Sequence, residues 1–144
     1  MRKTRFSLIL AFCACIAAGL LLSGCKKDDP DPQEEQIKAL AGTWTLDRVT
    51  NDGTDVTAQY QQFTLTLTTD KTYSTTNGGN PWPARGTFDF PDDIITDRVN
   101  RDDNVVITIA EVTASSLALR FNINSVGAGT AAGITGSFTF SLTK

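Results

Sequence analysis

The sequence has 144 residues, of which 40% are apolar, and this length allows one domain. It contains no histidine, which excludes the usual general base near neutral pH, most serine and cysteine nucleophile arrangements and the commonest ligand of transition metals. The formal net charge of −3 gives no basic excess that would attract nucleic acid.

The N-terminal segment has the pattern of a signal peptide. A basic start is followed by an apolar run from Phe6 to Leu22, which is shorter than the roughly 20 apolar residues of a membrane-spanning helix. We therefore predict that residues 1–24 are removed. Three of the 13 basic residues and none of the 16 acidic ones would leave with this segment, so the formal net charge would become −6. We expect no nucleic-acid partner for such an acidic domain.

The segment Leu22-Ser23-Gly24-Cys25 resembles the lipobox of bacterial lipoproteins. The resemblance implies that Cys25 receives a diacylglycerol on its sulfur, becomes the new N-terminus and is then acylated on its amine. Two or three lipid chains make such an anchor durable. The alternatives are a plain secretory signal and an uncleaved anchor. Because the two other cysteines lie inside the signal, no thiol beyond Cys25 would remain for a disulfide or a metal site.

Residues 25–36 form the predicted tether between the anchor and the domain. The run "KKDDPDPQEE" from Lys26 to Glu35 contains no apolar side chain except its prolines, so we expect a solvated, extended linker. An acidic run directly after the cysteine resembles the export signals with which some Gram-negative bacteria send lipoproteins to the cell surface. A simple hydrophilic spacer is the alternative. The expected location is the outer membrane, on the cell-surface or the periplasmic face.

Residues 37–144 are predicted to form one all-β domain. A short helix or turn over residues 33–41 ends at Gly42, and a second short helix is plausible within Thr54–Phe63. Elsewhere apolar and polar residues alternate, as in strands with one buried face. The predicted strands lie near residues 43–50, 62–69, 72–77, 85–90, 94–99, 105–112, 116–124 and 136–143. Short connections favour an antiparallel meander that closes into a small barrel, with a β-sandwich as the alternative.

The first strand carries a family resemblance. Gly42-Thr43-Trp44, preceded by a helical turn and followed by a meander, resembles the start of lipocalin and calycin barrels. With the later runs "NDGTDVT" and "FTLTLTTDKTYST", the chain resembles the lipocalin-like domains of bacterial lipoproteins. The resemblance implies that Trp44 packs across the closed end of the barrel. It also implies that a basic side chain from a late strand lies over this ring, for which Arg120 is the best candidate.

A lipocalin-like barrel implies a small apolar or amphipathic ligand in its interior. The expected pocket residues are the inward-facing members of the predicted strands: Trp44, Phe63, Leu65, Leu119, Phe121, Phe138 and Phe140. The alternative is a filled barrel or sandwich whose outer surface binds an envelope protein or a glycan. A cavity of several hundred cubic ångströms separates the two hypotheses, because a filled interior offers no place for a ligand.

Trp82 stands between two prolines in the glycine-containing run "GGNPWPARG". Such a tryptophan is stiffly presented, and with Arg85 beside it the ring could contact a sugar or an apolar partner at the barrel mouth. Alternatively, Trp82 folds back as a plug over the open end of the core.

Little in the chain favours an enzyme or a cofactor. The pairs Asp92-Asp93 and Asp102-Asp103 lie in turn-forming sequence, where aspartate is favoured for local hydrogen bonding rather than acid/base work. The oxygen ligands of Asp97–Asn104 would suit calcium, but their spacing is not that of an EF-hand, and a solvated turn with local ion pairs is the alternative. The glycine-alanine run Ser125–Gly136 lacks the context of a phosphate-binding loop. We expect no catalytic residue, metal or cofactor.

Overall fold

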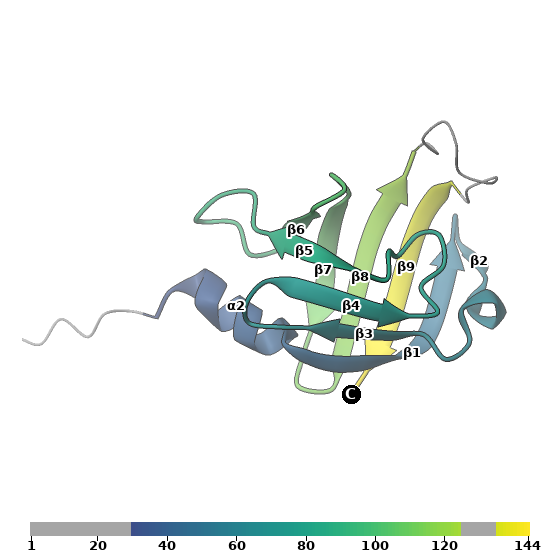
Figure 1. Cartoon of the computed structure of the whole chain (residues 1–144), viewed down its shortest axis with the longest axis horizontal. Helices are drawn as coiled ribbons and strands as arrows, with labels where there is room; N and C mark the ends of the chain where they lie inside the picture. Colours follow the sequence, from purple (N-terminus) through teal and green to yellow (C-terminus); the bar gives the residue numbers. More distant parts are fainter. Residues whose placement is uncertain (1–29, 125–134) are drawn as a thin grey trace, which may run out of the picture.

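Nine strands form one antiparallel sheet that closes on itself (Figure 1). The computed structural model describes residues 30–124 and 135–144. The strands are β1 (Gly42–Asn51), β2 (Thr54–Asp55), β3 (Thr64–Leu67), β4 (Thr72–Thr76), β5 (Arg85–Asp89), β6 (Arg98–Arg101), β7 (Val106–Val112), β8 (Ser116–Ile123) and β9 (Gly136–Thr143). Neighbours in sequence pair from β3 to β9, and β1 pairs with both β3 and β9, which closes a barrel of eight strands. The short strand β2 pairs only with β1 and is an additional strand outside this ring. The predicted antiparallel barrel is confirmed, and it is one closed sheet rather than a sandwich.

One predicted strand is misplaced. The sequence predicted a strand over 94–99, whereas β6 begins only at Arg98. The Asp92 side chain accepts hydrogen bonds from the backbone N–H groups of Ile94 and Ile95, at 3.0 and 3.1 Å, and this local turn keeps the segment out of the sheet. As a result, the Ile94 side chain is 87% exposed.

Helix α2 (Pro32–Leu40) covers one end of the barrel. Asp31 caps its N-terminus by accepting a hydrogen bond from the N–H of Gln33, and a proline at the first helical position suits a helix start. The helix buries Ile37 and Leu40 against the barrel. Residues 32–36 of the expected linker belong to this helix, which agrees with the short helix or turn predicted over residues 33–41.

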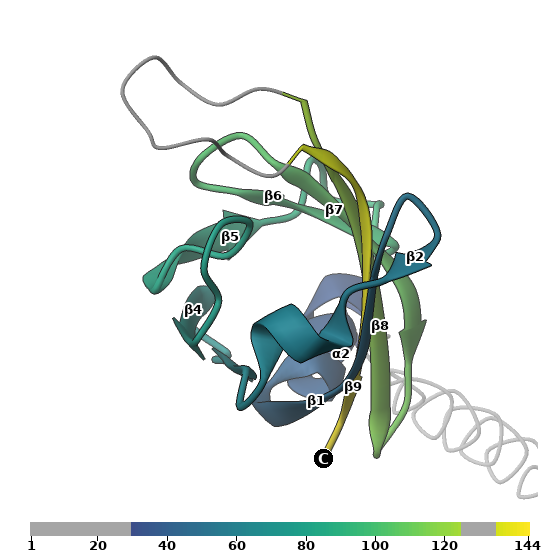
Figure 2. The ribbon, with the colours of Figure 1, turned by 90° about the vertical axis from the view of Figure 1, so that its right-hand side faces the viewer.

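The second predicted helix is shorter than expected. Within Thr54–Phe63, the first two residues form β2, and only η1 (Thr57–Tyr60) is helical, as one turn of 3₁₀-helix. The Asp55 carboxylate accepts a hydrogen bond from the N–H of Thr57 at 2.9 Å and starts this turn. Figure 2 looks along the barrel with η1 at the near end and α2 at the far end.

The core consists of side chains from alternate strand positions. In β9, for example, Phe138, Phe140 and Leu142 are almost fully buried, whereas the residues between them are not. This alternation is the pattern that predicted the strands. Within the described part of the chain, no helix has the length and apolar character needed to cross a membrane.

Phe140 tests how far the fold depends on this core. Its ring is fully buried and lies 5.1 to 6.3 Å from five other aromatic rings. We expect Phe140→Ala to lower the free energy of unfolding by about 3–5 kcal/mol in urea denaturation, because the loss of the ring leaves a cavity. The control is Val106→Ala in β7, where the side chain is 50% exposed and the expected loss is about 0.5 kcal/mol or less. Equal losses for the two variants would contradict this picture of the core.

Candidate functional site

The barrel interior contains a small apolar cavity. Its volume is about 20 Å³, which is room for about one water molecule, whereas ligand pockets usually enclose about 300–1,000 Å³. The cavity lies between the α2 end and the centre of the barrel, and its walls include Leu40, Tyr73, Trp82, Arg101, Ile109 and Leu119. In this structure the interior is therefore filled.

The predicted pocket residues all point inward, but most of them contact one another rather than a cavity. Each is at most 3% exposed. Only Leu119 among them borders the cavity. The set is Trp44, Phe63, Leu65, Leu119, Phe121, Phe138 and Phe140. These residues form the core of the barrel, and a pocket that they line is not present in this structure.

Trp82 occupies the centre of the barrel. It belongs to residues 77–84, which connect β4 to β5 at the same end as η1 (Figure 1). The side chain is 3% exposed, and its ring centroid lies 5.4 Å from Phe121, 5.7 Å from Tyr73 and 6.1 Å from Phe140. The prediction of Trp82 as a surface contact is therefore wrong, because these rings bury it as a plug. Arg85 is exposed at the start of β5, as a surface residue would be.

The local sequence explains how this loop turns inward. Gly78 lies so close to Trp82 that a β-carbon at position 78 would approach the Trp82 carbonyl oxygen to 2.6 Å, so the turn needs glycine. Thr75 fixes the other side of the loop, donating from its N–H to the Ala84 carbonyl oxygen and from its hydroxyl to the Pro83 carbonyl oxygen, at 2.9 Å each. The loop is thus held mainly at its ends.

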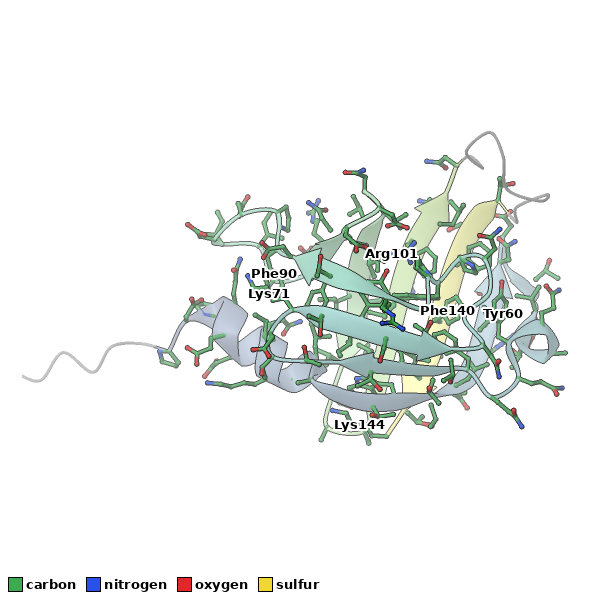
Figure 3. All side chains as sticks on the ribbon, in the orientation of Figure 1. Tyr60, Lys71, Phe90, Arg101, Phe140 and Lys144 are labelled. Carbon is green, nitrogen blue, oxygen red and sulfur yellow. The ribbon has the colours of Figure 1, made fainter. Side chains whose placement is uncertain are left out.

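Arg101, labelled in Figure 3, is a buried cation. Its Nε and Nη2 donate to the two carboxylate oxygens of Asp103, at 2.8 and 2.5 Å, and its Nη1 donates to the Pro81 carbonyl oxygen at 2.9 Å. The guanidinium carbon lies 5.0 Å from the centroid of the Trp82 ring and 5.9 Å from that of Phe121. These partners compensate for the removal of the charge from water.

The groups around Arg101 have shifted pKa values. Burial alone would raise the pKa of Asp103, but the hydrogen bond and charge of Arg101 outweigh it, so the pKa lies below its usual value. Burial raises the pKa of Tyr73 to about 12, so its hydroxyl stays protonated at neutral pH. That hydroxyl donates a long hydrogen bond of 3.4 Å to Asp102. At neutral pH the Asp103 carboxyl group is therefore ionised and the Tyr73 hydroxyl is neutral.

Two polar atoms in the aromatic core have no hydrogen-bond partner within the described residues: the Tyr60 hydroxyl and Trp82 Nε1. Both side chains are 3% exposed. Tyr60 lies in η1, and its ring packs 5.4 Å from that of Phe140, at the end of the barrel opposite Lys71 and Phe90 (Figure 3). A buried donor without a partner costs about 1–3 kcal/mol. These two unpaired groups, one in η1 and one in the loop between β4 and β5, therefore reduce the stability of the closed barrel.

The α2 end contains the predicted tryptophan and a different basic residue. Trp44 is fully buried, and its Nε1 donates to the Leu40 carbonyl oxygen at 2.8 Å. The side chain over its ring is that of Lys144, with Nζ 4.0 Å from the centroid and donating to the Ala41 carbonyl oxygen at 2.7 Å. Arg120 points outward from β8, so its predicted role is wrong. The lysine chain also crosses Gly42, where a β-carbon would approach Lys144 Cε to 2.7 Å.

Asp92 and Asp97 take the local roles expected of turns, whereas Asp102 bonds to other strands. Asp92 accepts backbone hydrogen bonds within its own turn, and Asp97 pairs with Arg98 at 3.3 Å. Asp102 accepts hydrogen bonds from the Thr87 N–H in β5 at 3.1 Å and from the Tyr73 hydroxyl in β4. Across residues 30–124 and 135–144, no three carboxylates lie in a cluster that could hold a metal ion. Cys25 and residues 1–24 lie outside the described residues, as does most of the Ser125–Gly136 run.

Comparison with known families agrees with this geometry. The family model of the lipocalin-like domain matches residues 40–119, which is more than half of the chain. The chain therefore belongs to the lipocalin-like domain family. No curated protein and no solved structure matches it in the corresponding comparisons.

Lys144→Ala tests the lysine over Trp44. We expect it to lower the free energy of unfolding by about 1–2 kcal/mol, because it removes one cation–π contact and one hydrogen bond. The matched control is Arg120→Ala, for which we expect about 0.5 kcal/mol or less on an exposed strand face. Urea denaturation of the two variants decides between them, and a larger loss for Arg120→Ala would restore the sequence-based assignment.

Proposed function

We propose that this chain is a lipid-anchored binding protein of the outer membrane, whose lipocalin-like barrel takes up a small apolar or amphipathic ligand when the Trp82 loop withdraws. The family and the closed barrel support a binding role, since an eight-stranded barrel can hold either its own side chains or one small ligand. A catalytic role has no such support among the described side chains.

One observation carries this proposal: the centre of the barrel is filled by a loop side chain. A strand residue such as Phe140 cannot leave the interior without breaking the hydrogen-bonded ladder between strands. Trp82 can leave with its loop, because few hydrogen bonds join the loop to the strands. Two run from Thr75 in β4 to the base of the loop, and one runs from Arg101 in β6 to the Pro81 carbonyl oxygen beside the ring. Its departure would join the space of the indole ring to the existing cavity of about 20 Å³, which Trp82 borders.

The position of α2 supports an orientation relative to the membrane. Six residues separate Cys25 from Pro32, where the helix begins, and such a segment spans at most about 25 Å. A lipid on Cys25 would therefore hold the α2 end of the barrel near the bilayer. The Trp82 loop, at the opposite end, would face away from the bilayer and remain accessible to a ligand from solution.

A second candidate function is a filled barrel that binds an envelope protein or a glycan through its outer surface. The small volume of the cavity favours it, because the structure as it stands has no room for a ligand. The two candidates differ in what they require of Trp82: the first needs its loop to move, and the second does not.

Labelled palmitate tests the anchor. We expect the protein expressed in a Gram-negative host to incorporate the label and to fractionate with the outer membrane, because Cys25 follows a lipobox-like segment. Cys25→Ser should abolish incorporation, whereas Cys15→Ser, which changes a cysteine inside the predicted signal, should not. Label that persists in the Cys25→Ser variant would contradict lipidation at this position.

Recovery of the native ligand tests the binding role. The full-length protein would be purified from its own host, denatured and extracted, and the extract analysed by mass spectrometry. We expect one small molecule to be recovered, in larger amount from Trp82→Ala than from wild type, because the plug no longer competes for the space. Asn80→Ala, an exposed change in the same loop, should match wild type. Extracts without any enriched molecule, from wild type and Trp82→Ala alike, would favour the second candidate.

A further inference from the structure

We propose that the space occupied by the Trp82 ring and the Pro81 carbonyl oxygen is a binding site for a neutral, planar aromatic molecule that carries a carbonyl group. The loop over residues 77–84 fills this site as an internal substitute for the ligand. This inference rests on the proposed binding role and specifies the chemical class of the ligand.

The walls around Trp82 are suited to a flat aromatic ring. The rings of Tyr73, Phe121 and Phe140 meet the indole at interplanar angles of 74°, 80° and 82°, which are edge-to-face contacts. The Arg101 guanidinium lies over the indole at 5.0 Å. Edge-to-face contacts and a cation over a ring both favour an aromatic group over an aliphatic chain of similar volume. A planar ligand in the same place would gain the interactions that Trp82 makes now.

Arg101 also sets a polar requirement. Its Nη1 donates to the carbonyl oxygen of Pro81, the residue directly before Trp82. When the loop withdraws, this oxygen leaves together with the indole, and a buried guanidinium N–H loses its partner. A ligand must then supply an acceptor next to its ring. A site that hydrogen-bonds its ligand rejects analogues without the matching group strongly, because the buried donor stays unpaired.

The charges around the site favour a neutral acceptor. Arg101 is already paired through two hydrogen bonds with the carboxylate of Asp103. One guanidinium charge is therefore already compensated by one carboxylate. An anionic ligand would add a second negative charge at this buried guanidinium, whereas a ketone or amide oxygen reproduces the Pro81 carbonyl. The class is thus an aromatic ketone or amide rather than an aromatic acid.

The closed loop also contains a feature that favours its release. Trp82 Nε1 is buried without a hydrogen-bond partner among the described residues, and it would regain one from water outside the barrel. Pro81 and Pro83 restrict the backbone on either side of the ring, so we expect the segment to move as a unit about the Gly78-Gly79 turn. A ligand that satisfies Arg101 and leaves Trp82 in water would remove an unpaired donor from the core.

Displacement of the ring is measurable in the full-length protein in detergent micelles, with ¹⁵N-labelled tryptophan. The probe is a naphthyl ketone, propionyl-dimethylaminonaphthalene, and the matched control compound carries propyl in place of propionyl. We expect the ketone to accelerate exchange of the Trp82 indole N–H with water about tenfold or more, because the bound state holds the ring outside. Exchange at Trp44 should not change, because its N–H donates to Leu40 within the α2 end. The propyl compound should bind about tenfold or more weakly.

Variants separate this site from any other. Trp82→Ala should bind the ketone about tenfold more tightly than wild type, because the ligand no longer displaces a ring, and Asn80→Ala should bind it as wild type does. If Trp82→Ala does not fold, the exchange measurement on wild type decides the question. Equal binding of the ketone and the propyl compound, or unchanged Trp82 exchange at saturation, would overturn the proposal. Recovery of a purely aliphatic native ligand would overturn it too, while leaving the binding role intact.

Discussion

The pairing of β1 with β9 is the constraint on which the rest of this structure depends. β1 pairs with β3 over Gly42–Thr45 and with β9 over Thr45–Asn51, and its register shifts between Leu46 and Arg48. One strand thereby holds both edges of the sheet. Once the sheet is closed, its interior has a fixed size, and every inward side chain must share that space at the packing density of a protein core.

This fixed volume explains why a plug and a ligand would exclude each other. The strands supply most of the core through residues such as Phe138 and Phe140, and α2 closes one end with Leu40. The remaining space at the centre takes one more aromatic side chain, that of Trp82. Because a barrel of eight strands is only wide enough for side chains or one small ligand, the indole and a bound molecule would compete for the same place. The apparent affinity would then depend on how often the loop is open.

The sequence predicts the strands and the barrel because alternation with a period of two is a local signal. It predicts less of the site, because the destination of a loop side chain is set by the finished barrel and not by its neighbours in sequence. Trp82 is the example: its two prolines suggest stiff presentation, and they are equally compatible with presentation to the core. The strand expected over 94–99 failed for another local reason, since the Asp92 side chain competes for the backbone N–H groups there.

Strand parity contained information about the two cations that lie over tryptophan rings, Lys144 and Arg101. Arg120 lies between the inward residues Leu119 and Phe121, so it had to point outward, whereas Lys144 continues the inward series of Phe140 and Leu142. Arg101 likewise has the parity of buried Val99 in β6. The difference in chemistry between these two cations matters: the Lys144 ammonium group stays near solvent over Trp44, and the Arg101 guanidinium is enclosed.

An enclosed guanidinium is a costly way to support a plug. Replacing a buried ion pair by apolar side chains of similar volume is often neutral or stabilising. If Trp82 only filled the core, an apolar residue at position 101 would therefore stabilise the barrel as well as Arg101 does. Arg101 is instead oriented by Asp103, with one N–H directed at the carbonyl oxygen next to the plug. That geometry adds little to a static core. It is the arrangement expected of a binding site for an aromatic ring with an adjacent oxygen. The loop supplies both groups in this structure, and a ligand would supply them when the loop withdraws.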